Sequence, residues 1–370
     1  MVALTHYLPP YMARVLLHAS HQVRNLEILL SVAQEPNRRY ECTWDGLNVQ
    51  VQKSIMLRRA WKHKLGFEDE LYVHFPYDTI SRLRRIRPNI ILSYELGFRS
   101  LASWFYAKSH GAKLALCVCV SEHTEQGRGV IRYGLRKWLL RQANAVTYNG
   151  PSCRRYLEKL GVDTDKLHYF PYATSDQFQY LGPTTRQPQD DHRLLYIGQL
   201  SDRKGIMLLL SGLGEYCLRQ PDRKLHLTII GTGDREPNIR ALPIPHNLNV
   251  RMLGHLNYEQ ICSEMSQHGA LIFPTLADEW GLVVNEALQA GLPVIGSVYS
   301  QAVTTLIEEN LNGWQFTPDQ SETLFHALDQ FFAHDNQSLE PLREAAQKTV
   351  KDITSPNVAN LLVDMFRQLQ

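Results

Sequence analysis

Short apolar runs alternate with longer stretches of helical spacing along most of the chain. Runs of roughly four to eight apolar residues between helices indicate βα units and a parallel sheet. We predict strands at 2–6, 27–32, 89–95, 113–120, 145–149 and 167–172 in the first half, and at 194–198, 225–231, 250–254, 269–274 and 292–296 in the second. The pattern therefore predicts an α/β protein with two doubly wound, Rossmann-like halves.

The segment "TSDQFQYLGPTTRQPQDDHR" interrupts this pattern and is polar and rich in Pro, Gly and Gln. Such a composition is typical of a linker. A chain of 370 residues is also too long for one ordinary core and suits two domains. We therefore expect an N-terminal domain over 1–174, a linker over 175–192 and a C-terminal domain over 193–354, followed by a final amphipathic helix, 355–370.

The two halves differ in charge. Residues 1–174 hold 25 Lys and Arg against 14 Asp and Glu, whereas residues 175–370 hold 14 against 23. A basic half favours an anionic surface or ligand. Nothing resembles a nucleic-acid-binding module and the second half is acidic, so we expect no nucleic acid partner.

The basic half contains "SIMLRRAWKHKLGF", residues 54–67, in which Leu57, Trp61 and Leu65 share one helical stripe among four cations. This spacing predicts a basic amphipathic helix, which either lies on an anionic membrane or is the solvated face of a core helix. The segments 82–87 and 128–141 add further positive charge.

The six cysteines lack metal-ligand or redox spacing, which is typical of reduced thiols. No apolar run reaches the roughly 20 residues of a membrane helix, and the first residues lack the features of a signal peptide. We expect a cytoplasmic protein, soluble or peripheral at the inner face of a membrane.

Candidate chemistry is concentrated in "DEWGLVVNEALQAGLPVIG", Asp278 to Gly296, which follows a predicted strand. A helix that starts at Gly281 would offer the amides of Gly281, Leu282 and Val283 to an anion such as a diphosphate. Glu286 lies roughly 7 Å further along that helix, a distance that suits the ribose beyond the diphosphate. Asp278, before the helix, would then reach a sugar. The alternative is that both acids merely complement the helix dipole. The apolar neighbours of Glu286 favour the first interpretation.

Two other loops follow strands of the second half. In "YIGQLSDRKGI" the cations Arg203 and Lys204 open a helix and can neutralise a diphosphate. In "IIGTGDR" the glycines Gly231 and Gly233 suit a tight turn beside a nucleotide. Glu236 occupies the third glycine position of a dinucleotide fingerprint, so we expect no nicotinamide cofactor.

In this order along 190–320, the motifs resemble those of retaining GT-B glycosyltransferases, glycosyltransferase family 4 in particular. Asp278 and Glu286 have the E-x7-E spacing of that family, and "YIGQLSDRKG" resembles its G-R-L-x-x-x-K-G loop. The segment "VRMLGHLNYEQICSEMSQHGALIFPT" resembles the one that lines the base pocket. In the first half, "THYLPPYMARV" resembles the acceptor-side loop and "SEHTEQGRG" the loop near the reaction centre.

The resemblance implies the GT-B fold, in which two Rossmann-like domains face each other across a cleft and the closing helix returns to the first domain. It implies transfer of a sugar from a nucleoside diphosphate sugar, first of all a UDP-sugar, to an acceptor hydroxyl with retention of configuration. No metal or cofactor is required. The implied catalytic residues are His123, Glu122 and Asp278. The implied donor-binding residues are Gln199, Arg203, Lys204, Gly231, Gly233, Gly254, His255, Glu279, Trp280, Gly281, Leu282, Val283 and Glu286.

The chain departs from the family pattern in three places. Asp278 replaces a glutamate, Gln199 stands where an arginine is usual, and "LPPY" replaces a glycine pair in the first loop. The acceptor is left open between a small molecule, a saccharide and a lipid-linked compound. Two alternatives are a nucleotide-sugar epimerase or hydrolase and a nucleotide-sugar-binding protein without transferase activity.

Overall fold

A computed structural model describes residues 1–36, 44–174, 176, 180, 182–183, 186–187 and 192–370. The chain divides into two compact units. The first comprises Met1–Asp176 together with Ile353–Gln370, and the second comprises Gln177–Asp352. Each unit has its own parallel sheet, which confirms the predicted doubly wound α/β architecture. Each predicted strand coincides with an observed one to within about three residues at its ends.

The sheet of the first unit has the strand order β3-β2-β1-β6-β7-β8-β9, and all neighbours are parallel. The strands are β1 (Val2–Thr5), β2 (Glu27–Leu30), β3 (Asn48–Val51), β6 (Ile90–Tyr94), β7 (Lys113–Cys117), β8 (Ala145–Tyr148) and β9 (Leu167–Tyr169). The central strands are almost wholly apolar because helices cover both faces of such a sheet. The strand order reverses between β1 and β6.

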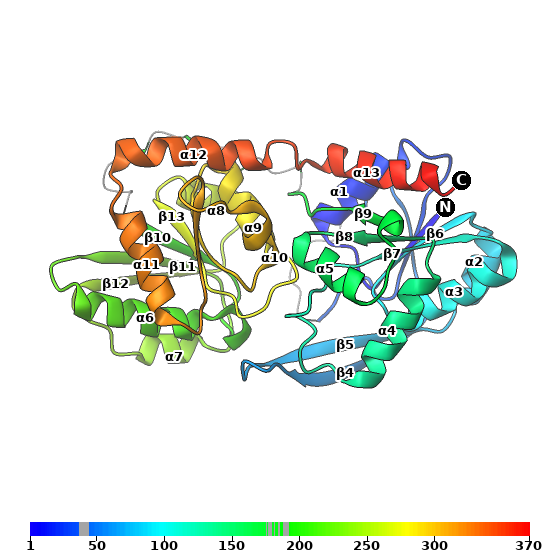
Figure 1. Ribbon diagram of the computed structural model, residues 1–370, viewed down its shortest axis with the longest axis horizontal. Helices are drawn as coiled ribbons and strands as arrows, with labels where there is room; N and C mark the ends of the chain where they lie inside the picture. Colours follow the sequence, from blue (N-terminus) through cyan, green and yellow to red (C-terminus); the bar gives the residue numbers. More distant parts are fainter. Residues whose placement is uncertain (37–43, 175, 177–179, 181, 184–185, 188–191) are drawn as a thin grey trace. The chain divides into compact units, whose positions relative to one another are not determined.

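The helices of the first unit are α1 (Pro10–Ser20), α2 (Thr79–Ile86), α3 (Phe98–His110), α4 (Val130–Gln142), α5 (Pro151–Lys159) and α13 (Ser355–Gln368), with a short 3₁₀ helix at Thr164–Lys166. Figure 1 shows the C-terminal helix α13 beside α1. Val358, Leu362 and Phe366 of α13 share one buried cluster with Met12 and Leu16 of α1. The C-terminal helix therefore completes the core of the first unit.

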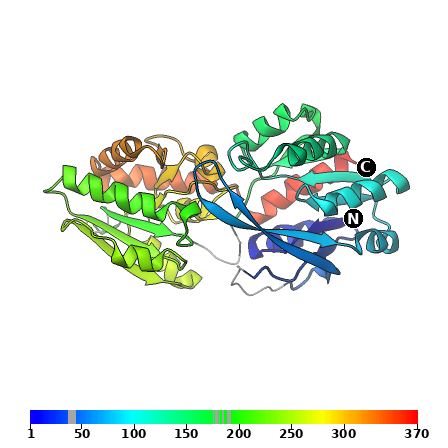
Figure 2. The ribbon, with the colours of Figure 1, turned by 90° about the horizontal axis from the view of Figure 1, so that it is seen from below.

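The predicted amphipathic helix over 54–67 is wrong. The segment forms β4 (Ser54–Lys62), which pairs in antiparallel register with β5 (Glu68–Pro76). Figure 2 shows the pair as a twisted ribbon, drawn in blue. The same residues that fit a helical stripe also fit period-two alternation, and cross-strand pairing with "EDELYVHFP" overrides the helical spacing. Gly66, with a φ of 86°, allows the connecting turn.

The second unit has a parallel sheet of order β12-β11-β10-β13-β14-β15. Its strands are β10 (Arg193–Ile197), β11 (Leu225–Ile230), β12 (Leu248–Gly254), β13 (Ala270–Phe273), β14 (Val294–Ser297) and β15 (Gly313–Phe316). Its helices are η3 (Asp202–Lys204), α6 (Ile206–Arg219), α7 (Glu236–Ala241), α8 (Tyr258–Met265), α9 (Leu282–Gln289), α10 (Gln301–Leu306), α11 (Ser321–Phe332) and α12 (Asn336–Val350).

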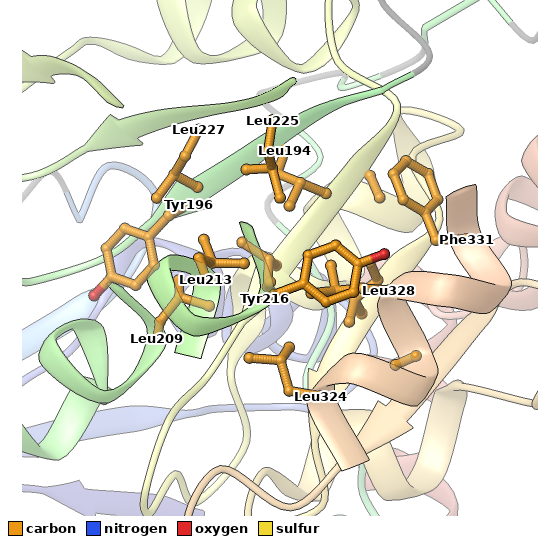
Figure 3. Close-up of a cluster of buried hydrophobic side chains, with 14 of the residues drawn as sticks. Leu194, Tyr196, Leu209, Leu213, Tyr216, Leu225, Leu227, Leu324, Leu328 and Phe331 are labelled. Carbon is orange, nitrogen blue, oxygen red and sulfur yellow. The ribbon is translucent and has the colours of Figure 1, made fainter. Parts of the chain in front are cut away.

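The core of the second unit lies between this sheet and helices α6 and α11. Figure 3 shows Tyr196 of β10, Tyr216 of α6 and Phe331 of α11 among the leucines of this cluster. The Tyr216 hydroxyl reaches the Asp329 carboxylate at 2.7 Å, so its polar end has a partner. This packing supports the strand order, which reverses between β10 and β13.

The described part of the expected linker packs against the second unit. Tyr180 and Arg186 are buried, and the Arg186 guanidinium donates to the carbonyls of His268, Ala290 and Gly291 at 2.9, 2.8 and 3.2 Å. The linker residues 175, 177–179, 181, 184–185 and 188–191 lie outside the described residues. Although the segment is polar in composition, Tyr180 and Arg186 are packed into the second unit.

Within the described residues, no helix combines the length and the hydropathy needed to cross a bilayer.

Candidate functional site

The three predicted loops of the second unit lie together at the carboxyl edge of its sheet. They follow β10, β11 and β13, which are neighbours in the strand order. The Leu200 amide donates to the Thr232 carbonyl at 3.0 Å, and the Leu276 amide donates to the Arg203 carbonyl at 2.8 Å. The sequence spreads these loops over about 80 residues, and the sheet brings them into direct contact.

Gly231 and Gly233 are required by the packing of these loops. A Cβ at Gly231 would lie 1.9 Å from the Gly198 carbonyl oxygen, and one at Gly233 would lie 2.3 Å from that of Leu200. The Gly231 amide also donates to the Gly254 carbonyl at 2.7 Å. Loop packing alone therefore explains why these two positions are glycine, without a ligand. The neighbouring Gln199 and His255 are exposed.

Lys204 and Asp278 form an ion pair across the edge between β10 and β13. Their side chains are only 17% and 15% exposed. Burial alone would raise the pKa of Asp278, but the charges of Lys204 and Arg203 outweigh it and hold that pKa below its ordinary value. Arg203 itself donates to the Ala277 carbonyl at 3.1 Å. The predicted phosphate-binding cation and the predicted sugar-binding acid are thus in direct contact, and a diphosphate would compete with Asp278 for Lys204.

Helix α9 begins where the sequence predicts it to begin. Gly281 adopts a φ of 102°, and a Cβ there would lie 2.7 Å from the Phe273 ring. Leu282 and Val283 form the first turn, in which helix amides have no partner within the helix. Buried Trp280 fixes this start, because its indole nitrogen donates to the Asn285 side chain at 2.7 Å.

Glu279 contributes to the helix start through its backbone. Its carbonyl accepts from the Gln301 side chain at 2.9 Å, whereas its own side chain is exposed. Trp280 and Glu279 thus shape the loop, and the amides of α9 are the groups that suit an anion.

Glu286 lies half-buried on α9 among Tyr180, Tyr258 and Cys262. Burial raises the pKa of the Glu286 carboxyl to about 7, and the Tyr180 hydroxyl opposes this shift. The rings of Tyr180 and Tyr258 meet edge to face with centroids 6.1 Å apart. Sequence reasoning did not identify Tyr180 or Tyr258. The available signal for Tyr180 was an aromatic residue within an otherwise polar linker.

His123 and Glu122 belong to the first unit, in the loop after β7. The His123 carbonyl accepts from His63 Nε2 at 2.9 Å, and the two rings are 4.8 Å apart. Glu122 is exposed and pairs with Lys159 at 2.5 Å. The indole nitrogen of Trp61 donates to the Gln126 carbonyl at 3.0 Å. The β4–β5 ribbon, which the sequence did not predict, therefore holds this loop.

Over the described ranges, the structure contains no group of three or more His, Cys, Asp or Glu side chains arranged to hold a metal ion.

Residues 183–349 match the family Glycosyl transferases group 1. Alpha-D-kanosaminyltransferase of Streptomyces kanamyceticus is 24% identical over 46% of this chain and 46% of that protein. The phosphatidylinositol N-acetylglucosaminyltransferase gpi3 subunit of Schizosaccharomyces pombe is 25% identical over 60% of this chain and 50% of that protein. The matches thus span about half the length of these curated relatives.

Several solved structures resemble the whole chain, two of which serve as examples. Anabaena HepE in complex with UDP has a TM-score of 0.72 and 14% identity, and the match covers 99% of both chains. The apo form of the lipopolysaccharide outer core galactosyltransferase WaaB has a TM-score of 0.70 and 14% identity, covering 100% of this chain and 99% of that one. The fold is therefore GT-B, and the match to the group 1 glycosyl transferase family lies within the second unit.

Proposed function

We propose that this chain is a retaining glycosyltransferase of family 4 that moves a sugar from a nucleoside diphosphate sugar to an acceptor hydroxyl. The observation that carries the proposal is the convergence of Lys204, Asp278, the start of α9 and Glu286 at one sheet edge of the group 1 domain. The acceptor is a saccharide or a lipid-linked compound.

Each group at this edge has a chemical role in the proposal. Lys204 and the amides of Leu282 and Val283 hold the diphosphate and stabilise its charge as it leaves. Glu286 accepts hydrogen bonds from the ribose hydroxyls, and Asp278 accepts from a hydroxyl of the sugar. Arg203 adds a second cation, and Gly254 and His255 border the base. No metal is needed, because protein cations and amides neutralise the diphosphate.

Uridine is the proposed base. HepE, which shares the fold, is described in complex with UDP and with UDP-glucose. Calorimetric titration with UDP, GDP and ADP, without metal and then with magnesium, tests this choice. We expect micromolar binding of UDP alone without metal. Binding that requires magnesium contradicts the metal-free role, and failure of all three nucleotides contradicts the donor site.

Retention follows if the acceptor attacks from the side on which the diphosphate leaves. A phosphate oxygen then takes the acceptor proton, and the protein mainly positions the reactants. His123, with Glu122 as the second candidate, is proposed to contact the donor sugar. Proton NMR of the first-formed product tests the stereochemistry, and an inverted anomeric proton signal would refute it. Incubation of donor without acceptor separates transfer from the epimerase, hydrolase and binding-only alternatives.

We also propose that the first unit contacts an anionic membrane through α4. Val130 and Ile131 are 85% and 86% exposed. Leu135 and Trp138 are also exposed and continue the stripe from Ile131 at helical spacing, and Lys137 lies on the same helix. An exposed apolar stripe with cations suits the interface of an anionic bilayer.

Co-sedimentation with phosphatidylglycerol and phosphatidylcholine vesicles tests this surface. We expect binding to the anionic vesicles only, and loss of binding in Ile131→Glu. Equal binding of wild type and Ile131→Glu would exclude α4 as the contact.

A further inference from the structure

The sheet of the first unit has its own reversal point, between β1 and β6. From β1 the chain passes through α1 to β2 on one side, and from β6 it passes through α3 to β7 on the other. Crevices at such points are where doubly wound sheets bind ligands. The residues directly after the two strands are His6 and Glu95.

These two residues meet across the reversal point. His6 Nδ1 lies 2.9 Å from Glu95 Oε1, and Arg99 Nη1 lies 3.3 Å from Glu95 Oε2. Arg99 is buried, and it also donates to the Tyr94 carbonyl at 3.1 Å and to Ser31 Oγ at 2.5 Å. Residues that follow β1, β2 and β6 therefore fix one carboxylate.

The backbone at Glu95 supports a special role. Its φ of 71° lies in the left-handed region, which a glutamate rarely adopts. Arg87 and Asn310 share this conformation among the described residues, but Arg87 ends helix α2 and asparagine tolerates it in turns. Neither explanation applies to Glu95, which does not end a helix and is not an asparagine. Strain of this kind concentrates where a side chain is held for function.

A second layer of buried polar groups lies behind the pair. His74, which comes from β5, reaches Glu35 at 3.2 Å, and Glu35 lies 3.9 Å from His6. Both His74 and Glu35 are at least nine-tenths buried. His74 Nδ1 is buried and has no hydrogen-bond partner among the described residues. The ribbon thus contributes an unsatisfied polar atom to this cluster.

The Glu95 carboxylate stays open on one side. Its side chain is 46% exposed and that of His6 is 25% exposed, whereas Arg99 beneath them is 3% exposed. Burial opposes ionisation, but His6 and Arg99 outweigh it and hold the pKa of Glu95 well below its usual range. Among the described residues, Arg99 is the only permanent cation in this cluster, and Glu95 already pairs with it. The described part of the site therefore offers an acceptor of hydrogen bonds and no spare cation for a phosphate.

We propose that His6 and Glu95 form a hydroxyl-binding site in the first unit whose ligand is a neutral saccharide or polyol. Adjacent hydroxyls of the sugar donate to the Glu95 carboxylate, and His6 hydrogen-bonds a neighbouring hydroxyl. That this sugar is the acceptor rests on the proposed function. The binding of a neutral sugar to the first unit is independent of the proposed function.

Saturation-transfer NMR on the full chain without nucleotide tests the site. The probes are lactose, N-acetylglucosamine and glycerol, with glucose 6-phosphate and glycerol 3-phosphate as anionic counterparts. We expect signal from at least one neutral sugar and none from the phosphates. Glu95→Gln should weaken the binding of that sugar about tenfold, because it removes the charge that strengthens the hydrogen bonds. Glu158→Gln, an exposed carboxylate on α5, is the matched control and should bind as wild type does.

His6→Asn is the second variant, because it leaves the contact between Arg99 and Glu95 in place if Glu95→Gln fails to fold. It should weaken sugar binding several-fold. The inference is overturned if both folded variants bind the sugar as wild type does, if the phosphorylated probes bind better, or if no neutral probe binds. UDP titration of the same samples separates the two proposals. Sugar binding without UDP binding contradicts the proposed function alone, and UDP binding without sugar binding contradicts this inference alone.

Discussion

At the reversal point of each sheet, a basic side chain after one strand pairs with a carboxylate after the neighbouring strand. The two sites differ in the charge of the group that remains available to a ligand. In the second unit, Lys204 after β10 pairs with Asp278 after β13. In the first unit, His6 after β1 pairs with Glu95 after β6. The difference lies in what remains available to a ligand. The second unit offers a permanent cation and helix amides, whereas the first offers a carboxylate whose cationic partner is buried beneath it.

This comparison shows that fold position alone does not select a ligand. A helix start that a glycine brings close to the sheet edge favours an anion. An ionised carboxylate whose cationic partner is buried, as Glu95 is with Arg99, favours hydroxyl groups as ligands.

Gly281→Ala should destabilise the second unit most. Its Cβ would lie 2.7 Å from the Phe273 ring at a φ of 102°. We expect a loss of about 2–5 kcal/mol in the free energy of unfolding, from left-handed strain and overpacking together. Gly254→Ala is the matched control, because it has a φ of 69° and no atom within 4 Å, and it should lose only about 1–2 kcal/mol. Urea unfolding measures both, and equal losses would show that the contact with Phe273 is unimportant.

Lys204→Ala should weaken UDP binding by about 1.5–3 kcal/mol, the range for hydrogen bonds to charged groups. Binding of uridine, which has no phosphate, should hardly change. Lys224→Ala, an exposed lysine of the same unit, is the control. Calorimetric titration with UDP and with uridine measures both affinities. An equal loss of affinity for uridine would indicate a misfolded site instead of a lost cation.

Glu286→Ala should cost a similar 1.5–3 kcal/mol at most, but for UDP and uridine alike. The wild-type affinity should also depend on pH. Since burial raises the pKa of Glu286 to about 7, the carboxyl is protonated below that value and cannot accept from both ribose hydroxyls. Affinity should therefore fall by at most about tenfold per pH unit below 7, and Glu286→Gln should remove that dependence. A wild-type affinity that is flat between pH 5.5 and 8 would exclude the ribose contact.

The raised pKa also makes a prediction about folding. The native state binds the Glu286 proton up to about pH 7, whereas the unfolded chain releases it near 4.5. This carboxyl therefore contributes a stability that is present at low pH and is lost as pH rises from 4.5 to 7. Comparison of wild type with Glu286→Gln by urea unfolding across that range should show the two curves diverging as pH rises. Parallel curves would mean that the carboxyl is already ionised in the fold.

Trp61→Phe should have the smallest effect and should be confined to the first unit. It removes the hydrogen bond to Gln126 that anchors the loop of His123, at a cost of about 1 kcal/mol. Transfer should slow while UDP binding stays unchanged. Trp104→Phe, on α3, serves as the control. A change in UDP affinity would show that the ribbon acts on the donor site as well.

The sequence predicts the sheets well because parallel strands buried on both faces are near-continuous apolar runs. It fails at β4, where Leu57 and Trp61 satisfy helical spacing and strand alternation equally. Trp61 is the one buried residue of β4, so the strand has no continuous core face to distinguish the two. Only its partner strand, residues 68–76, resolves the ambiguity, and that pairing is not a local property.

The donor-site candidates are visible in the sequence because they lie in short local motifs. Lys204 and Asp278 could each be identified, but their contact could not, because it joins loops 74 residues apart. Glu95 lay at the end of a predicted strand and carried no motif, and His6 lay in the segment that resembles an acceptor-side loop but was not singled out within it. Only the strand order brings them together. Tyr180 could not be identified because the segment that contains it is polar and was interpreted as a linker.

The ion pair of Lys204 with Asp278 means that the second unit carries its own counter-ion. Arrival of a diphosphate is then an exchange of partners, in which Lys204 leaves the Asp278 carboxylate for a phosphate oxygen. Such an exchange should make nucleotide affinity less sensitive to ionic strength than a site with an unpaired lysine. It also frees Asp278 at the moment when the diphosphate arrives, so the phosphate itself releases the carboxylate that the sugar hydroxyl is proposed to bind.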